Sequence, residues 1–154
     1  MDLRKIASFQ ADHRKMGKGM YVSRTDDDVV TYDIRMKKPN AEKVLGNGAL
    51  HTIEHLFATY ARSSDLSDKV IYVGPMGCRT GFYLLVRDMS RGGAIELVRK
   101  SFAFIADFEG PIPGASEAEC GNWKDHDLRG ARAEAEKYLL VLEDWDEAKL
   151  TYPV

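Results

Sequence analysis

The sequence predicts an α+β fold in which an antiparallel β-sheet packs against α-helices. Two observations predict this class. Segments with strand-like alternation come first, and later strands and helices mix without the regular βαβ alternation of a parallel sheet. The chain has 154 residues, of which 44% are hydrophobic. This is enough for one sizeable core and too little to divide comfortably into two, so we expect a single domain spanning residues 1–154.

The expected elements follow in order from alternation, helical spacing and turn residues. The run Thr25-Asp26-Asp27-Asp28 indicates a turn between two strands, which predicts an N-terminal hairpin. The Gly46-Asn47-Gly48 breaker precedes a helix, and the Pro111 to Gly114 loop follows a second one. The predicted strands are Met20–Arg24, Val29–Met36, Val70–Val73 and Gly81–Val86, and the predicted helices are Ala49–Arg62, Gly93–Ala106 and Leu128–Glu143.

The composition excludes several classes of partner. Charged residues make up 30% of the chain but nearly cancel, to a net charge of -2, so we expect no nucleic acid partner. The longest apolar stretches, such as Phe82–Val86, are far shorter than the roughly 20 residues of a membrane helix. We therefore expect a soluble, cytosolic protein without membrane association.

The helix predicted over Ala49–Arg62 carries a candidate metal site. His51 and His55 are one helical turn apart, so both imidazoles can reach one metal ion from the same face. Apolar residues gather on the opposite face and predict a buried stripe. Glu54 completes an H-x-x-E-H pattern, which is also the inverted zinc-protease motif, in which the carboxylate acts on metal-bound water. The motif alone therefore leaves the reaction open.

Two cysteines supply the remaining candidates. Both lie in glycine-containing, loop-like segments, and in a cytosolic chain metal binding or catalysis is a better explanation than a disulfide. Cys120 is the leading candidate for a third ligand, since a thiolate adds the charge that two neutral imidazoles lack. Cys78 either closes a structural His2Cys2 site or acts as a proton-transfer group beside Arg79. Spacing does not choose between these two roles.

Three segments together resemble the S-ribosylhomocysteine lyase (LuxS) family. They are HTIEHLFATYAR, GPMGCRTGFY and AECGNWKDHDL, in the family's order and at similar separations, with weaker matches in ASFQADH and YDIRMKKPN. The resemblance runs from about Ser8 to Leu128. One departure is Tyr72-Val73-Gly74, where many relatives have Asp-x-Ser, so a ligand contact by that aspartate is not expected here.

The resemblance implies a reaction and a set of residues. It implies a bacterial, cytoplasmic enzyme that cleaves S-ribosylhomocysteine to homocysteine and 4,5-dihydroxy-2,3-pentanedione, the autoinducer-2 precursor used in quorum sensing, and that serves the activated methyl cycle. The implied metal is Fe2+, with Zn2+ or Co2+ as substitutes and no organic cofactor. It would be held by His51, His55 and Cys120, with Cys78 and Glu54 as general base and acid.

The resemblance also implies how substrate is held. Arg35, Ser8 and His13 match family positions near the ligand, and Arg35 is expected to pair with the substrate carboxylate. A homodimer with active sites at its interface is implied as well. Two rivals remain on the residues alone. One is a small inverted-motif metallopeptidase with Glu54 activating water, and the other is a non-enzymatic protein with a structural His2Cys2 metal site.

Overall fold

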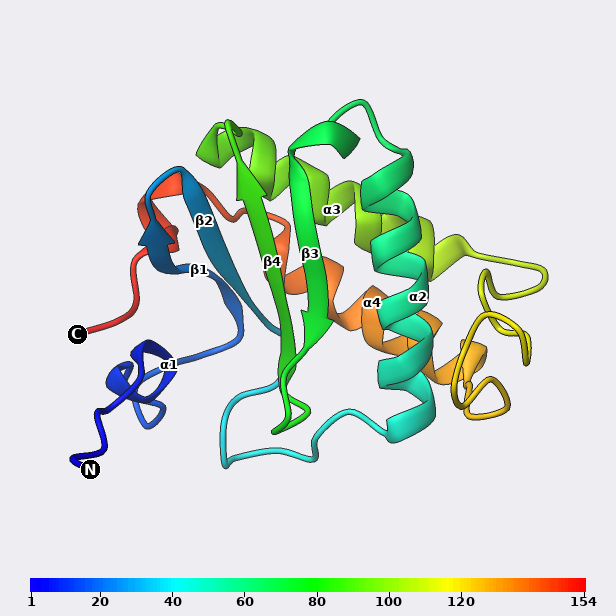
Figure 1. Cartoon of the computed structure of the whole chain (residues 1–154), viewed down its shortest axis with the longest axis horizontal. Coiled ribbons are helices and arrows are strands. Elements are labelled where there is room, and N and C mark those ends of the chain that lie inside the picture. Colours follow the sequence, from blue (N-terminus) through cyan, green and yellow to red (C-terminus); the bar gives the residue numbers. More distant parts are fainter.

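The computed structural model describes all residues from 1 to 154 and has one antiparallel sheet. Its four strands are arranged in the order β1-β2-β4-β3 (Figure 1). The strands are β1 (Gly19–Asp26), β2 (Val29–Arg35), β3 (Val70–Pro75) and β4 (Gly81–Arg87). The predicted α+β class and the N-terminal hairpin are therefore confirmed, and every predicted strand is present with bounds shifted by a few residues at most.

Three long helices cover one face of this sheet (Figure 1). They are α2 (Asn47–Ser63), α3 (Arg91–Asp107) and α4 (Leu128–Leu142). Each begins where the sequence places a breaker or a cap: the side chains of Ser90 and Asp127 accept hydrogen bonds from the backbone N–H groups of Gly93 and Gly130. No helix combines the length and apolar composition that crossing a bilayer requires.

Three short elements are not predicted from the sequence. They are the helix α1 (Ala7–Gln10) and the 3-10 turns η1 (Ser67–Lys69) and η2 (Glu147–Leu150). None of them is long enough to develop an apolar stripe with a helical period.

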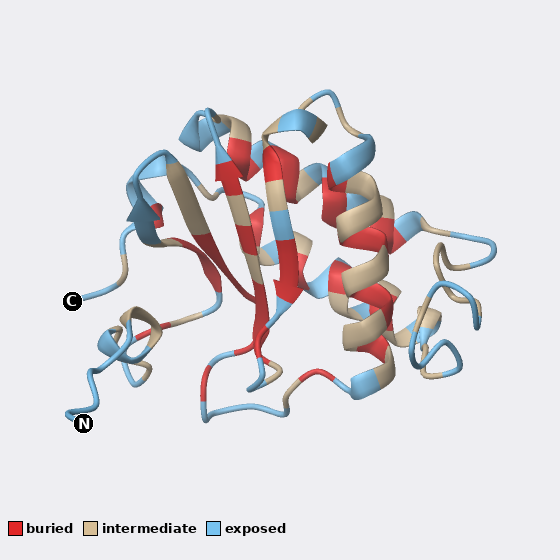
Figure 2. Cartoon of the chain, in the orientation of Figure 1, coloured by how far each residue is buried: buried red, intermediate tan, exposed pale blue.

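The core lies between the sheet and the three helices (Figure 2). Alternate residues of β2 and β4 point into it, and Phe82, Leu84 and Val86 are fully buried. Ile53 and Phe57 of α2 pack against these residues from the helix side, together with buried apolar residues of α3 and α4. The sheet face turned away from the helices carries the intervening residues, which include Thr31, Asp33, Tyr83 and Leu85.

The two ends of the molecule carry the irregular segments (Figure 1). The N-terminal segment and the C-terminus lie beside β1, whereas the loop between α3 and α4 lies along α2 at the opposite end. Much of both segments is exposed or half-buried (Figure 2). Helix α2 is thus enclosed between the core and a loop, which positions its polar face.

The close approach of β2 and β4 generates a stability prediction. A Cβ added at Gly81 would lie 1.9 Å from the carbonyl oxygen of Ile34, so Gly81→Ala must push the two strands apart. We expect a loss of about 1–3 kcal/mol in the free energy of unfolding, measured by chemical denaturation. Gly77→Ala is the matched control in the same turn, because nothing lies within 4 Å of the added atom. Equal stabilities of the two variants would contradict this account.

Candidate metal centre

The polar face of α2 presents two imidazoles side by side. The rings of His51 and His55 meet edge to face, with centroids 4.6 Å apart. The opposite face of the helix packs Ile53, Leu56 and Phe57 into the core with no exposed surface. The helical period therefore separates a packing face from a chemical face, as the sequence predicts.

The loop between α3 and α4 orients both rings. The Nδ1 atom of His51 lies 2.8 Å from the carbonyl oxygen of Asp125, and Nδ1 of His55 lies 2.7 Å from that of Pro113. A carbonyl oxygen only accepts, so each Nδ1 carries the proton and donates. Each Nε2 atom then has a free lone pair, which is the form that binds a metal ion.

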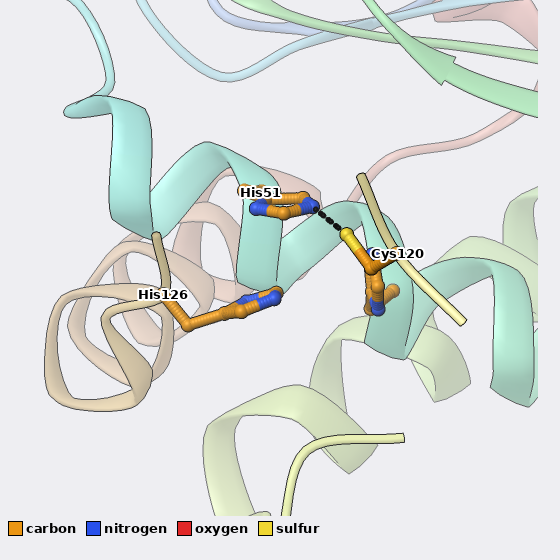
Figure 3. A group of neighbouring side chains, drawn as sticks. His51, Cys120 and His126 are labelled. Carbon is orange, nitrogen blue, oxygen red and sulfur yellow. Dashed lines mark hydrogen bonds between the residues drawn. The ribbon is translucent and has the colours of Figure 1, made fainter. Parts of the chain in front are cut away.

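The same loop brings Cys120 to these histidines. Its Sγ atom lies 3.4 Å from Nε2 of His51 (Figure 3), and the backbone N–H of Asn122 points at the sulfur from 3.5 Å. Zinc–sulfur and zinc–nitrogen bonds at tetrahedral angles would place two such ligand atoms about 3.6 Å apart. The donor set and its spacing therefore fit one divalent metal ion.

His126 belongs to the same cluster, although sequence analysis gives it no role. One ligand atom from each of His51, His55, Cys120 and His126 lies within 4.8 Å of the others. The His126 ring stacks on His51 with centroids 4.0 Å apart (Figure 3). Burial, and then the neighbouring His51 and His55, lower the pKa of His126, which favours a neutral ring. The only sequence signal is its place in the AECGNWKDHDL segment.

Glu54 lies beside the cluster but outside it. Its half-buried side chain lines a shallow cavity of about 320 Å³ together with His55, Ala58 and Val73. The small Ala58 side chain is one reason for this space. A carboxylate at the rim of a cavity next to a metal ligand is placed to exchange protons with a bound molecule.

Cys78 lies apart from the cluster, in the turn between β3 and β4. It is exposed, and its Sγ atom is 3.1 Å from Oγ1 of Thr80, its one hydrogen-bond partner. The cluster therefore contains three histidines and one cysteine, and a closed His2Cys2 site is not formed. The guanidinium of Arg79 is directed elsewhere, because it donates to the carbonyl oxygen of Leu45 and to Oδ1 of Asn47.

Arg35 is the guanidinium that connects to Cys78. It is only 2% exposed and donates to both carboxylate oxygens of Asp33, at 3.0 and 2.6 Å. A third N–H reaches Thr80 Oγ1 at 2.9 Å, next to the thiol. Tyr152 donates to Asp33 at 2.6 Å, and burial and that carboxylate raise the pKa of its phenol. Three of the five N–H groups of Arg35 are thus bound within the chain, which leaves two unpaired.

Ser8 and His13 lie far from the metal cluster within one chain. Ser8 is on α1 and His13 follows it, at the end of the molecule opposite the α3–α4 loop (Figure 1). Nδ1 of His13 donates to the carbonyl oxygen of Ala11 at 2.9 Å. A single chain therefore does not bring these two residues together with His51, His55 and Cys120.

Tyr72 and Gly74 form a pair at the edge strand. Tyr72 is 54% exposed, and its ring lies so close over Gly74 that an added Cβ would be 2.4 Å from the ring. The two departures from the Asp-x-Ser pattern are therefore coupled, since the flat ring occupies the space of the missing side chain.

Comparisons with known proteins agree with this geometry. The model of the S-ribosylhomocysteinase (LuxS) family matches residues 6–149. The chain is 51% identical to the S-ribosylhomocysteine lyase of Phocaeicola vulgatus, over 98% of each chain. It is 47% identical to the S-ribosylhomocysteine lyase of Borreliella burgdorferi, over 98% of this chain and 100% of that one. It is also 49% identical to the enzyme of that name from Porphyromonas gingivalis, over 98% and 99%.

The two cysteines provide a direct test of the metal centre. The cluster predicts one bound Co2+ per chain, with a thiolate-to-metal charge-transfer band in the near ultraviolet. We expect Cys120→Ser to lose this band and to weaken binding at least tenfold, because the thiolate is a ligand. Cys78→Ser is the matched control and should keep both the band and the stoichiometry. A band that disappears in Cys78→Ser instead would mean that the wrong cysteine has been placed at the metal.

Proposed function

Because the chain belongs to the S-ribosylhomocysteinase (LuxS) family, we propose that it is a metal-dependent carbon-sulfur lyase. Its substrate is S-ribosylhomocysteine, and its products are homocysteine and 4,5-dihydroxy-2,3-pentanedione. The observation that carries this proposal is the cluster of His51, His55 and Cys120, formed by two segments far apart in the sequence. Both segments lie within the region that the family model matches.

His51, His55 and Cys120 would hold the ion and would leave it open to a substrate oxygen. Two neutral imidazoles and one thiolate make up a three-residue set, which is typical of catalytic rather than structural sites. The ion we propose is Fe2+, with Zn2+ or Co2+ as substitutes. When bound, it supplies Lewis acidity toward a carbonyl oxygen of the opened sugar.

Glu54 and Cys78 move protons in this proposal. Shifting the carbonyl along the sugar chain needs repeated removal and return of protons at neighbouring carbons. Once the ketone lies next to an acidic C–H, a base takes that proton, a C=C bond forms, and the C–S electrons leave with homocysteine thiolate. Glu54 lines the cavity at His55, and Cys78 is exposed on its turn, so both side chains are accessible to a ligand.

A homodimer would bring the remaining residues to the site. Ser8 and His13 lie at the opposite end from the ligands, so they reach a metal centre only on a second copy. The outer face of the sheet is a suitable contact surface, since Tyr83 and Leu85 are half-buried and Tyr72 is exposed. Arg35, held by Asp33, would use its two free N–H groups for the substrate carboxylate.

Residues 1–154 form a single domain, which is supported by one hydrophobic cluster that includes residues of the sheet and all three long helices. The enzyme acts in the bacterial cytoplasm, where Cys78 and Cys120 stay reduced, consistent with their being unpaired.

The reaction is tested by thiol release from S-ribosylhomocysteine, followed with a thiol reagent under anaerobic conditions. Iron-loaded wild type should release homocysteine, whereas Glu54→Gln and Cys78→Ala should lose at least 100-fold in kcat, the usual scale of general acid-base catalysis. Metal content and unfolding curves of both variants serve as controls. An inactive wild type that is folded and metal-loaded would refute the lyase assignment.

The shared active site is tested by mixing two defective chains. His51→Ala lacks a metal ligand and His13→Ala lacks the N-terminal contact, so a mixed dimer contains one intact site. Random exchange of subunits in a 1:1 mixture makes about half of the dimers mixed, so roughly a quarter of all sites should be intact. The activity of the mixture should then exceed that of either variant alone. Mixing two samples of the same variant is the control. Activity no greater than the average of the separate variants, or a monomer in sedimentation, would contradict the shared site.

A further inference from the structure

The histidines of the cluster differ in what their Nδ1 atoms contact. Nδ1 of His51 and of His55 faces a backbone carbonyl oxygen, so the proton lies on Nδ1 and Nε2 is free to bind metal. Nδ1 of His126 instead lies 3.0 Å from the hydroxyl oxygen of Thr52. A hydroxyl group can donate or accept, so the tautomer of His126 depends on the other contacts of Thr52.

The contacts of Thr52 show which ring nitrogen of His126 carries the proton. Thr52 is completely buried, and its Oγ1 also lies 3.0 Å from the backbone nitrogen of Asp127, which can only donate. The hydroxyl proton of Thr52 then has one acceptor within reach, which is Nδ1 of His126. The opposite arrangement would leave a buried hydroxyl proton without an acceptor, which is rare in folded proteins. A neutral His126 therefore carries its proton on Nε2.

That Nε2–H group is buried beside the ligands and has no partner. No hydrogen-bond acceptor in the chain reaches Nε2 of His126, and the atom is shielded from solvent. The ring extends from the loop before α4 towards Cys120, below the ring of His51 (Figure 3). Its centroid is 4.0 Å from that of His51 and 4.8 Å from that of His55. The chain itself therefore supplies no acceptor for this proton.

We propose that His126 is not a fourth metal ligand but a hydrogen-bond donor, whose Nε2–H binds an oxygen atom that occupies the open coordination position. A protonated Nε2 has no lone pair for the ion, so the position stays available. A positioned N–H next to a metal stabilises negative charge that develops on the oxygen. Thr52 is then a positioning residue, since it acts on the oxygen only through His126.

The tautomers are read directly by long-range ¹H–¹⁵N correlation spectra of the zinc-loaded and the metal-free protein. We expect His126 to carry its proton on Nε2 in both, and His51 and His55 to carry theirs on Nδ1. Thr52→Val removes the hydroxyl donor and should shift His126 towards the Nδ1–H tautomer. Thr59→Val, on the same helix, is the matched control and should leave the spectrum of His126 unchanged. A zinc-bound, unprotonated Nε2 on His126 would overturn the proposal.

A binding measurement tests the acceptor. Acetohydroxamate, an oxygen-donor probe, is titrated into the Co2+-loaded protein and followed by the visible spectrum. We expect His126→Ala to keep one Co2+ per chain and the Cys120 charge-transfer band, but to bind the probe about tenfold or more weakly. His126→Gln places an amide N–H near the position of Nε2 and should recover most of the affinity. Loss of Co2+ from His126→Ala to the same extent as from His55→Ala would identify a ligand and refute the donor role.

This inference rests on the proposed metal centre, and the two fail in different ways. If the protein binds no divalent ion, the ligand assignment fails, while the tautomer of His126 is still measured in the metal-free protein. If metal binds as proposed but the probe affinity is equal in wild type and His126→Ala, the donor role fails alone.

Discussion

The packing of α2 against the sheet is the constraint on which the metal centre depends. Phe57 of this helix meets Phe102 and Phe82, with ring centroids 5.2 and 6.3 Å apart, and none of the three rings is exposed. These contacts fix the rotation of the helix about its axis. Because neighbouring residues are about 100° apart, a rotation by one residue would turn His51 and His55 away from the loop that completes the site.

The loop between α3 and α4 contributes as much to the centre as the helix does. It has no regular hydrogen-bond ladder of its own, so its backbone carbonyl groups need other partners. Those at Pro113 and Asp125 find them in the two imidazoles of α2. The same contacts that satisfy the loop therefore set the tautomer of each ligand and bring Cys120 into range. The folded conformation of the loop therefore brings the candidate ligands together.

The sequence predicts the elements better than it predicts their long-range partners. Alternation in Val29–Met36 and helical spacing over Ala49–Arg62 are local signals, so these elements could be predicted. The role of His126 could not, because its orientation depends on Thr52, which is 74 residues away. The contact between Tyr152 and Asp33 spans 119 residues and is equally invisible in local periodicity. Motifs thus indicate the candidate ligands, whereas the hydrogen bonds that orient these side chains appear only in the folded chain.

Arg35, the proposed contact to the substrate carboxylate, is itself buried in an ion pair. Expected from the sequence as a substrate contact, its guanidinium lies in the sheet, paired with both oxygens of Asp33. Taking such a pair out of water costs several kcal/mol per ion before the attraction repays it, so a buried pair is weak evidence for stability. What the arrangement does provide is a guanidinium in a fixed position, joined through Thr80 to the Cys78 thiol.

Hydrogen bonds connect the β3–β4 turn, which contains Cys78, to helix α2, which carries His51 and His55. Arg79 donates to Asn47, the first residue of α2, at 3.1 Å, and to the carbonyl oxygen of Leu45 just before it. One side of this turn is therefore anchored to the buried pair in the sheet and the other to the start of α2. Movement of the thiol relative to His51 would have to break one of these anchors. The Cys78 thiol belongs to the sheet layer and the histidines belong to the helix layer. Their relative position is set by the hydrogen bonds that Thr80 accepts and Arg79 donates, because the thiol and the imidazoles do not contact each other.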